Sequence, residues 1–159
     1  MTLEAGALIA KDGSVIHWHL PAERSVGYLP DSHDLWEVIM ANRDNVLGFA
    51  HSHPGSGKPG PSMEDLTTFS ALEKALGRKL VWWITSADQL VEVELVGPGK
   101  YDYETMLEET PPEWLEQLRK HSYYEHRMVR RWSGGPPQEI PRGLAELAPK
   151  PGEPENDRN

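Results

Sequence analysis

Residues 48–65 read GFAHSHPGSGKPGPSMED, and most expectations for the fold start from this stretch. The apolar run at 45–53 ends in two histidines and predicts a strand that is buried on both faces and central in a sheet. Residues 54–61 are mostly glycine and proline, which predicts a loop. The run at 62–77 begins with a capping residue, Ser62, has apolar residues at helical spacing and ends in glycine, so it predicts a helix.

The two histidines and the start of this helix are expected to meet at one point. Side chains two apart on a strand share a face, so His51 and His53 project the same way. The loop is long enough to fold Ser62 and Asp65 back over the end of the strand. Two imidazoles and one carboxylate without a fourth protein ligand leave a position open for water, which is typical of a catalytic zinc site. The sequence therefore predicts a metal site at His51, His53 and Asp65.

A hydrolytic zinc site also needs a group that carries protons. A carboxylate close to the metal, but not bound to it, can take a proton and later pass it to the leaving group. Glu4 is the candidate, because it is a lone charge at the start of the apolar run at 3–10. Glu37 is the rival base, although we expect it on the exposed face of a helix.

Simpler interpretations exist for parts of this pattern. Ser62 and Asp65 have the spacing of a capping box, which needs no function. His17 and His19 are also two residues apart, but no Ser–Asp pair follows them, so we interpret them as structural. The remaining histidines are expected near a helix start or in solvent: His33, His121 and His126.

The rest of the chain predicts a mixed sheet with helices packed on it. Its expected elements are a hairpin at 3–10 and 15–20, a short strand at 26–29, a helix at 31–44 capped by Asp31 or Ser32, and a second hairpin at 79–86 and 89–96. We expect a catalytic core over residues 1–100. An acidic linker and a C-terminal helix follow over 101–132, where Trp114, Leu118 and Met128 could pack on the core or on a partner. Residues 133–159 are rich in proline, glycine and charge, and we expect them to be disordered.

Composition limits the function classes. The chain has 159 residues and a formal net charge of −9, which argues against a phosphate backbone as the default partner. It has no cysteine, so neither a disulfide nor a thiolate metal site is possible. No signal peptide and no run of membrane-spanning length is visible, so we expect a cytoplasmic protein that binds neither nucleic acid nor membrane.

Taken together, the upstream glutamate, H-S-H-P, the Gly/Pro loop and S-x-x-D resemble the JAMM metalloprotease motif of the MPN (JAB) domain family, prokaryotic type. The resemblance covers about residues 1–96 and implies an α/β (α+β) fold, a mixed sheet flanked by helices with a cytidine-deaminase-like architecture. It implies one catalytic Zn²⁺ held by His51, His53 and Asp65, with Glu4 as acid/base and Ser62 stabilising the tetrahedral intermediate. Two features depart from the family pattern. The loop has eight residues, where seven is usual, and glycine stands two rather than three residues after Glu4.

The resemblance also implies an activity. It is hydrolysis of the peptide or isopeptide bond after the C-terminus of a ubiquitin-like or sulfur-carrier protein, with activating or conjugating enzymes as further partners. Two alternatives stay open: a RadC-like protein of the same fold with a DNA-linked role, and an MPN binding module that has lost activity. The net charge and Ser52, between the histidines, count against the RadC-like alternative.

Overall fold

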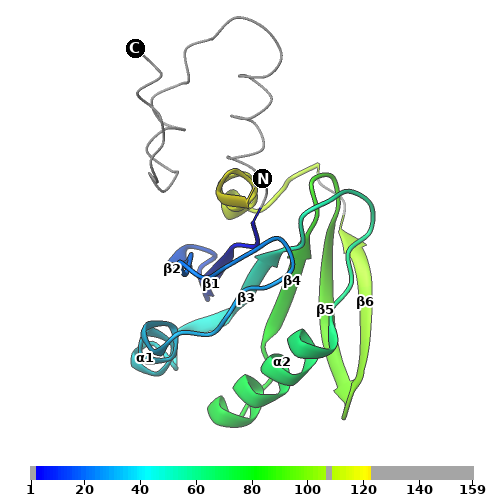
Figure 1. Cartoon of the computed structure of the whole chain (residues 1–159). Helices are drawn as coiled ribbons and strands as arrows, with labels where there is room; N and C mark the ends of the chain where they lie inside the picture. The colour runs from blue at the N-terminus through cyan, green and yellow to red at the C-terminus, as the bar shows by residue number, and fades with distance from the viewer. Residues whose placement is uncertain (1–2, 107–108, 123–159) are drawn as a thin grey trace, which may run out of the picture.

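A six-stranded mixed sheet with helices on both faces forms the fold (Figure 1). The structure is a computed structural model that describes residues 3–106 and 109–122. Its strands are β1 (Gly6–Ala10), β2 (Val15–His19), β3 (Val46–Ser52), β4 (Val81–Thr85), β5 (Leu90–Gly97) and β6 (Lys100–Met106). Its helices are α1 (His33–Ala41), α2 (Met63–Leu76) and a third over residues 113–122. The predicted mixed α/β class is confirmed.

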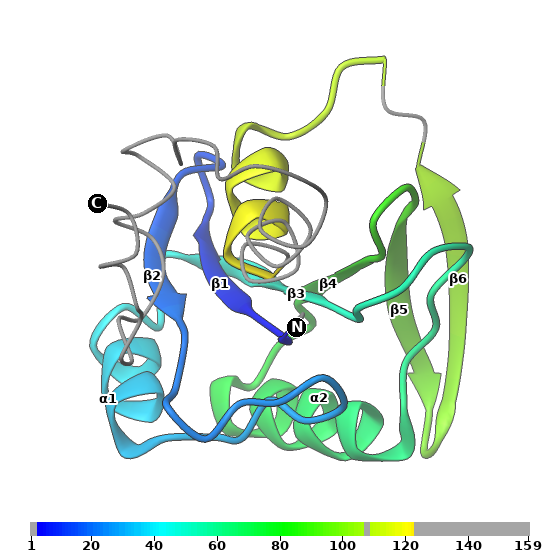
Figure 2. The ribbon, with the colours of Figure 1, turned by 45° about the horizontal axis from the view of Figure 1, so that its top comes forward.

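The strand order is β2-β1-β3-β4-β5-β6, which places β3 inside the sheet as predicted (Figure 2). β1 pairs antiparallel with both β2 and β3, and β4, β5 and β6 form an antiparallel run. Among the described strands, β3 and β4 are the one pair that runs parallel. A parallel pair needs a crossover connection, and α2 supplies it. The start of α2 therefore lies close to the end of β3.

Each face of the sheet has its own apolar core. α1 and α2 cover one face, where Leu35, Ile39, Phe49, Phe69 and Trp82 belong to one buried cluster. The helix over 113–122 covers the opposite face through Trp114, Leu115 and Leu118, which are buried against Ala5, Ala50 and Trp83. Of the two possibilities that the sequence left open for Trp114 and Leu118, the core or a partner, the structure shows packing on the core. None of the helices that the structure describes is long and apolar enough to cross a membrane.

Helix α2 begins and ends at the residues that the sequence marks, whereas α1 ends at Ala41, before the predicted end at residue 44. Ser32 caps α1 by accepting a hydrogen bond from the backbone N–H of Leu35, so the cap is Ser32 and not Asp31. Ser62 caps α2, and Gly77 ends it in the left-handed conformation, with φ of 70°. The predicted apolar stripe of α2 is buried: Leu66, Phe69, Leu72 and Leu76.

Three expectations are wrong. The acidic segment that begins at residue 101 is not a linker at its start, because residues 100–106 form the edge strand β6. The short strand expected at 26–29 is absent from the structure, which has only an isolated bridge between Ser25 and Tyr28 there. His121 is not solvated, since its ring packs on Trp18 with 4.9 Å between centroids. Met128, His126, the end of the C-terminal helix and the tail at 133–159 lie outside the described residues.

The half-buried position of His121 predicts a loss of stability in mild acid. Burial lowers its pKa to about 4 from an ordinary 6.5, and Arg24 adds to the shift. As the pH falls from 6.5 toward 4, the unfolded chain takes up this proton first, so the free energy of unfolding decreases. His121→Phe should reduce that decrease by on the order of 1 kcal/mol at pH 5. Urea unfolding at pH 7 and pH 5 measures it.

The control for this prediction is His33→Phe, at a side chain that is 83% exposed. It should leave the difference in stability between the two pH values unchanged. If His121→Phe is as sensitive to acid as the parent chain, His121 is not the group responsible.

Candidate metal centre

The end of β3 carries both histidines of the motif onto the sheet face that α1 and α2 cover. His51 pairs with Gly6 of β1 on one side and with Ile84 of β4 on the other. The backbone N–H of His53 donates to the carbonyl of Thr85, so the strand keeps its direction past its last residue. Because the side chains alternate, His51 and His53 point to the same side, as predicted.

The side chains of His51, His53 and Asp65 converge on one point. The Nε2 atoms of the two histidines are 3.1 Å apart. Asp65 Oδ2 lies 3.1 Å from Nε2 of His53 and 3.3 Å from Nε2 of His51. Residues twelve and fourteen positions apart in the sequence thus meet, and the loop between them folds the helix start over the strand end.

These three distances fit a tetrahedral metal site. Zinc binds imidazole nitrogen and carboxylate oxygen at about 2.0–2.1 Å, so neighbouring ligands of a tetrahedral ion are about 3.3–3.4 Å apart. The distances between the ligand atoms of His51, His53 and Asp65 lie within a few tenths of an ångström of this value. The donor set of two nitrogens and one oxygen also suits zinc. The residues present therefore fit the ion that the sequence predicts.

The electrostatics of the group favour a positive charge between its members. Burial alone would lower the pKa of His51, but the carboxylates of Asp65 and Glu4 raise it above its ordinary value. Burial would likewise raise the pKa of Asp65, but the charge of His51 and hydrogen bonds from His51, His53 and the Ser62 backbone hold it far below its ordinary range. A divalent cation supplies such a charge in coordination with the same lone pairs.

Glu4 lies beside this group at the entrance to β1. The residue is 8% exposed, and its carboxylate lies within 4.8 Å of the ligand atoms of His51 and His53. Burial raises its pKa, and the two histidines only partly oppose the shift. Glu4, His51 and His53 could therefore also hold a metal. Asp65 Oδ2 lies 3.3 and 3.1 Å from the two imidazoles, so Asp65 could equally supply the third ligand, with Glu4 beside the metal.

Ser62 and Asp65 do form a capping box, and the box does not exclude other roles. The Ser62 hydroxyl oxygen accepts from the backbone N–H of Asp65 at 3.0 Å, and the Ser62 N–H donates to Asp65 Oδ2 at 2.9 Å. The cap uses a lone pair of the hydroxyl and leaves its proton available to donate. The side chain of Ser62 is exposed at the helix start, and the cap also fixes Asp65 in place.

The eight-residue loop, residues 54–61, is held by the turn between β4 and β5. The N–H of Gly57 donates to Asp88 Oδ1 at 2.8 Å, and the Ser86 hydroxyl donates to the Gly57 carbonyl at 2.6 Å. The N–H of Ala87 donates to the Gly55 carbonyl at 2.9 Å. Gly55 and Gly57 have φ of 122° and 91°, values that residues other than glycine rarely adopt. The loop therefore reaches across to the neighbouring turn and is anchored there.

Asp88→Ala should weaken zinc binding by about tenfold or less, because it frees the loop between His53 and Asp65 without removing a ligand. Competition against a fluorescent zinc chelator measures the affinity. Asp88→Asn keeps an oxygen that can accept from Gly57 and should restore most of it. Equal affinities in all three proteins would show that the loop needs no anchor.

Sequence reasoning missed the residues that hold Glu4 in position. Ser52 lies between the histidines and faces the opposite side, where its hydroxyl accepts from the N–H of Ala5 at 2.9 Å. It donates in turn to the hydroxyl of Ser122, which donates to the carbonyl of Leu3. The guanidinium of Arg24 donates to the Glu4 carbonyl at 3.0 Å. The position of Ser52 in an apolar strand could have indicated a buried, hydrogen-bonded hydroxyl. The partners of Ser52 are too distant in the chain to be predicted from the sequence.

The other candidate residues lie outside the group. Glu37 pairs with His33 at 3.0 Å on the exposed face of α1, as expected for a residue without a catalytic role. His19 is buried, and its Nε2 lies 2.6 Å from the carbonyl of Pro30. This contact supports a structural role for His19, because it ties β2 to the segment that precedes α1.

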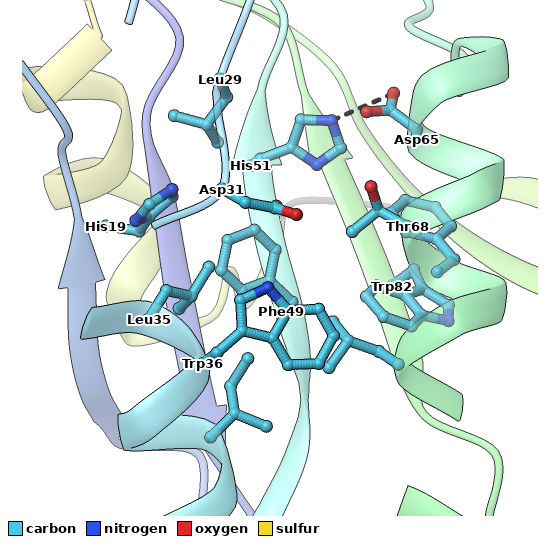
Figure 3. A pocket seen from close by; sticks show the side chains of 13 residues that line it. His19, Leu29, Asp31, Leu35, Trp36, Phe49, His51, Asp65, Thr68 and Trp82 are labelled. Atoms are coloured by element: carbon cyan, nitrogen blue, oxygen red, sulfur yellow. Dashed lines mark ion pairs between the residues drawn. The ribbon is translucent and has the colours of Figure 1, made fainter. Parts of the chain in front are cut away.

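A pocket opens from the metal centre into the space between α1 and α2 (Figure 3). His51 and Asp65 lie at one end of it, and Leu35 and Trp36 lie at the other. The floor is apolar and includes Phe49, Phe69 and Trp82, so the pocket is suited to an apolar group held close to the metal.

Comparison with known proteins agrees with this geometry. The family model described as prokaryotic homologs of the JAB domain matches residues 2–96, which are 95 of the 159 residues. No curated protein matches the chain. The matched residues include the two histidines, Asp65 and Glu4. With the fold, the convergent ligand atoms and this match in agreement, the chain belongs to the family of prokaryotic JAB-domain proteins.

Proposed function

We propose that this chain is a zinc-dependent peptidase or isopeptidase that hydrolyses the bond after the C-terminus of a ubiquitin-like or sulfur-carrier protein. The convergence of His51, His53 and Asp65 beside Glu4 is the observation that carries the proposal. The family includes metalloproteases and also inactive members, so membership alone does not decide activity. An intact ligand set with a buried carboxylate next to it favours the active class.

The residues of the site have separate tasks in this proposal. His51, His53 and Asp65 would hold the ion, which when bound would polarise the scissile carbonyl and lower the pKa of a water so that it loses a proton more easily and becomes a better nucleophile. Glu4 accepts the proton of the attacking water and delivers it to the leaving amine. Its raised pKa suits this task, because a proton carrier works best when its pKa is closer to the working pH. The hydroxyl proton of Ser62 donates to the oxyanion that develops on the substrate.

The family match and the general ability of a sheet edge to pair with an extended chain support this substrate class. An extended C-terminal tail can pair with the edge of a sheet and lead its last carbonyl toward the metal. A ubiquitin-like fold with such a tail is the substrate, and its activating or conjugating enzymes are further partners. We place the activity in the cytoplasm, and we propose neither nucleic acid nor membrane as a partner.

Zinc dependence is the direct test. The purified full chain should contain about one zinc, and it should cleave a fluorescent reporter from the C-terminus of at least one protein in a panel of ubiquitin-like and sulfur-carrier fusions. Dialysis against a chelator should abolish cleavage, and added zinc should restore it. A chain that binds no zinc at neutral pH contradicts the proposal. A chain that binds zinc and the fusion proteins but cleaves none of them is an inactive binding module.

A further inference from the structure

The pocket beside the metal centre is lined in part by β3 and α2, the same two elements that position His51 and Asp65. On β3, Phe49 lies two residues before His51 and on the same face. On α2, Thr68 and Phe69 lie one turn beyond Asp65. One helical turn rises about 5.4 Å and two strand residues rise about 6.6 Å. The pocket floor therefore begins about one side chain away from the ligand atoms.

The aromatic side chains of the pocket floor are held in place by contacts with one another and with α2. Phe69 and Trp82 stack at 4.0 Å between centroids with 10° between their planes. The Trp82 indole N–H donates to a carboxylate oxygen of Glu73 at 2.8 Å, which fixes the ring. His51 contacts Phe69 edge-on at 6.1 Å. An aromatic surface thus runs without interruption from a metal ligand into the pocket, and it does not depend on a bound group to form.

The lining combines a few polar side chains with a larger apolar surface. Its polar members are His19, Asp31, His51, Asp65 and Thr68, and its other members are apolar or aromatic. Leu35, Ile39, Phe69 and Trp82 are at most 5% exposed. A polar or very small group gains little binding free energy from such a surface. A large apolar group gains more, because its apolar surface is removed from water.

We infer that this pocket binds a large apolar side chain, aliphatic or aromatic, of the substrate residue that flanks the scissile bond. The inference rests on the proposed function, because a scissile carbonyl bound at the metal would bring the adjacent substrate residue to the pocket. The pocket then selects substrates by that side chain. A substrate with only glycine on both sides of the bond leaves the pocket empty and loses this part of the binding energy.

Two metal-chelating probes separate the pocket from the metal centre. Acetohydroxamate and 3-phenylpropionohydroxamate share the chelating group and differ in the apolar tail. Binding to the zinc-loaded full chain is followed by tryptophan fluorescence, since Trp36 and Trp82 line the pocket. The phenyl compound should bind about tenfold to a hundredfold more tightly, the gain expected when a phenyl group is buried.

Thr67 and Thr68 offer a matched pair of variants on α2. Thr68 lines the pocket and Thr67 is exposed, so Thr68→Phe should fill the pocket and remove the advantage of the phenyl compound. Thr67→Phe should keep that advantage, and both variants should still bind acetohydroxamate. The parent chain should cleave reporter fusions with leucine or phenylalanine next to the scissile bond with a higher kcat/KM than fusions with glycine there. Thr68→Phe should show no such difference.

The outcomes distinguish the two proposals. If acetohydroxamate binds and the phenyl compound binds no more tightly, the pocket inference is wrong and the zinc site stands. The same holds if Thr67→Phe and Thr68→Phe lose the advantage equally. If zinc or acetohydroxamate does not bind at all, the proposed function fails and the pocket inference fails with it.

Discussion

Glu4→Gln should lower kcat by about a hundredfold to ten-thousandfold and leave zinc bound. The amide has the size of the carboxylate but cannot carry a proton between water and the leaving group. Glu4 is 8% exposed and lies beside His51 and His53, where its burial raises its pKa. Stopped assays on the reporter fusion measure kcat and KM, and atomic absorption on the same sample measures zinc.

The matched control is Glu37→Gln, at an exposed carboxylate that pairs with His33 on α1. Its activity should equal that of the parent chain. If Glu4→Gln keeps full activity, another group moves the proton. If it loses both zinc and activity, Glu4 is a ligand, which is the arrangement that the group of Glu4, His51 and His53 also permits.

Much of the fold could be read from local signals. The cap at Ser62 and the glycine at Gly77 bound α2 correctly, because both groups satisfy backbone atoms at the helix ends that have no other partner. The apolar run before His51 identified an interior strand, since a strand buried on both faces needs no polar residues. These features depend on neighbours a few residues away, and for that reason the sequence displays them.

The sequence does not readily predict the edge strand β6, because its charged residues are also typical of a linker. Asp102 and Glu104 suggested a linker, whereas Tyr101, Tyr103 and Thr105 alternate with them as in a strand. β6 pairs only with β5 and is largely exposed, so it tolerates charges that an interior strand would exclude. Charged side chains on an edge strand also hinder pairing with other chains.

The convergence of His51, His53 and Asp65 was predictable because the motif encodes its own geometry. Alternation brings His51 and His53 to one face, and a capped helix after a short loop brings Asp65 to them. The support for Glu4 and the pocket between α1 and α2 were not predictable. Both depend on contacts such as that of Ser52 with Ser122, seventy residues apart, which follow from the complete topology.

Asp65→Asn should weaken zinc binding by at least about a hundredfold, because a neutral amide replaces the anionic ligand. The amide oxygen can still accept from the Ser62 N–H, so the start of α2 should stay intact. Zinc at a hundred times its Kd stabilises the parent chain by about 2.7 kcal/mol, which is roughly 10 °C in Tm. Calorimetry with and without zinc should show this shift in the parent chain and almost none in the variant.

Two neighbouring substitutions separate ligation from capping. Ser62→Ala removes the hydroxyl that accepts from the Asp65 N–H, so it should lower stability by about 1 kcal/mol and keep most of the Tm shift with zinc. Glu64→Gln changes an exposed carboxylate in the same helical turn and should change neither. A full Tm shift in Asp65→Asn would mean that the histidines hold the ion with another group, and Glu4 is the carboxylate within reach. The contacts of Asp65 Oδ2 with both imidazoles, at 3.1 and 3.3 Å, favour Asp65 as the ligand and Glu4 as the proton carrier.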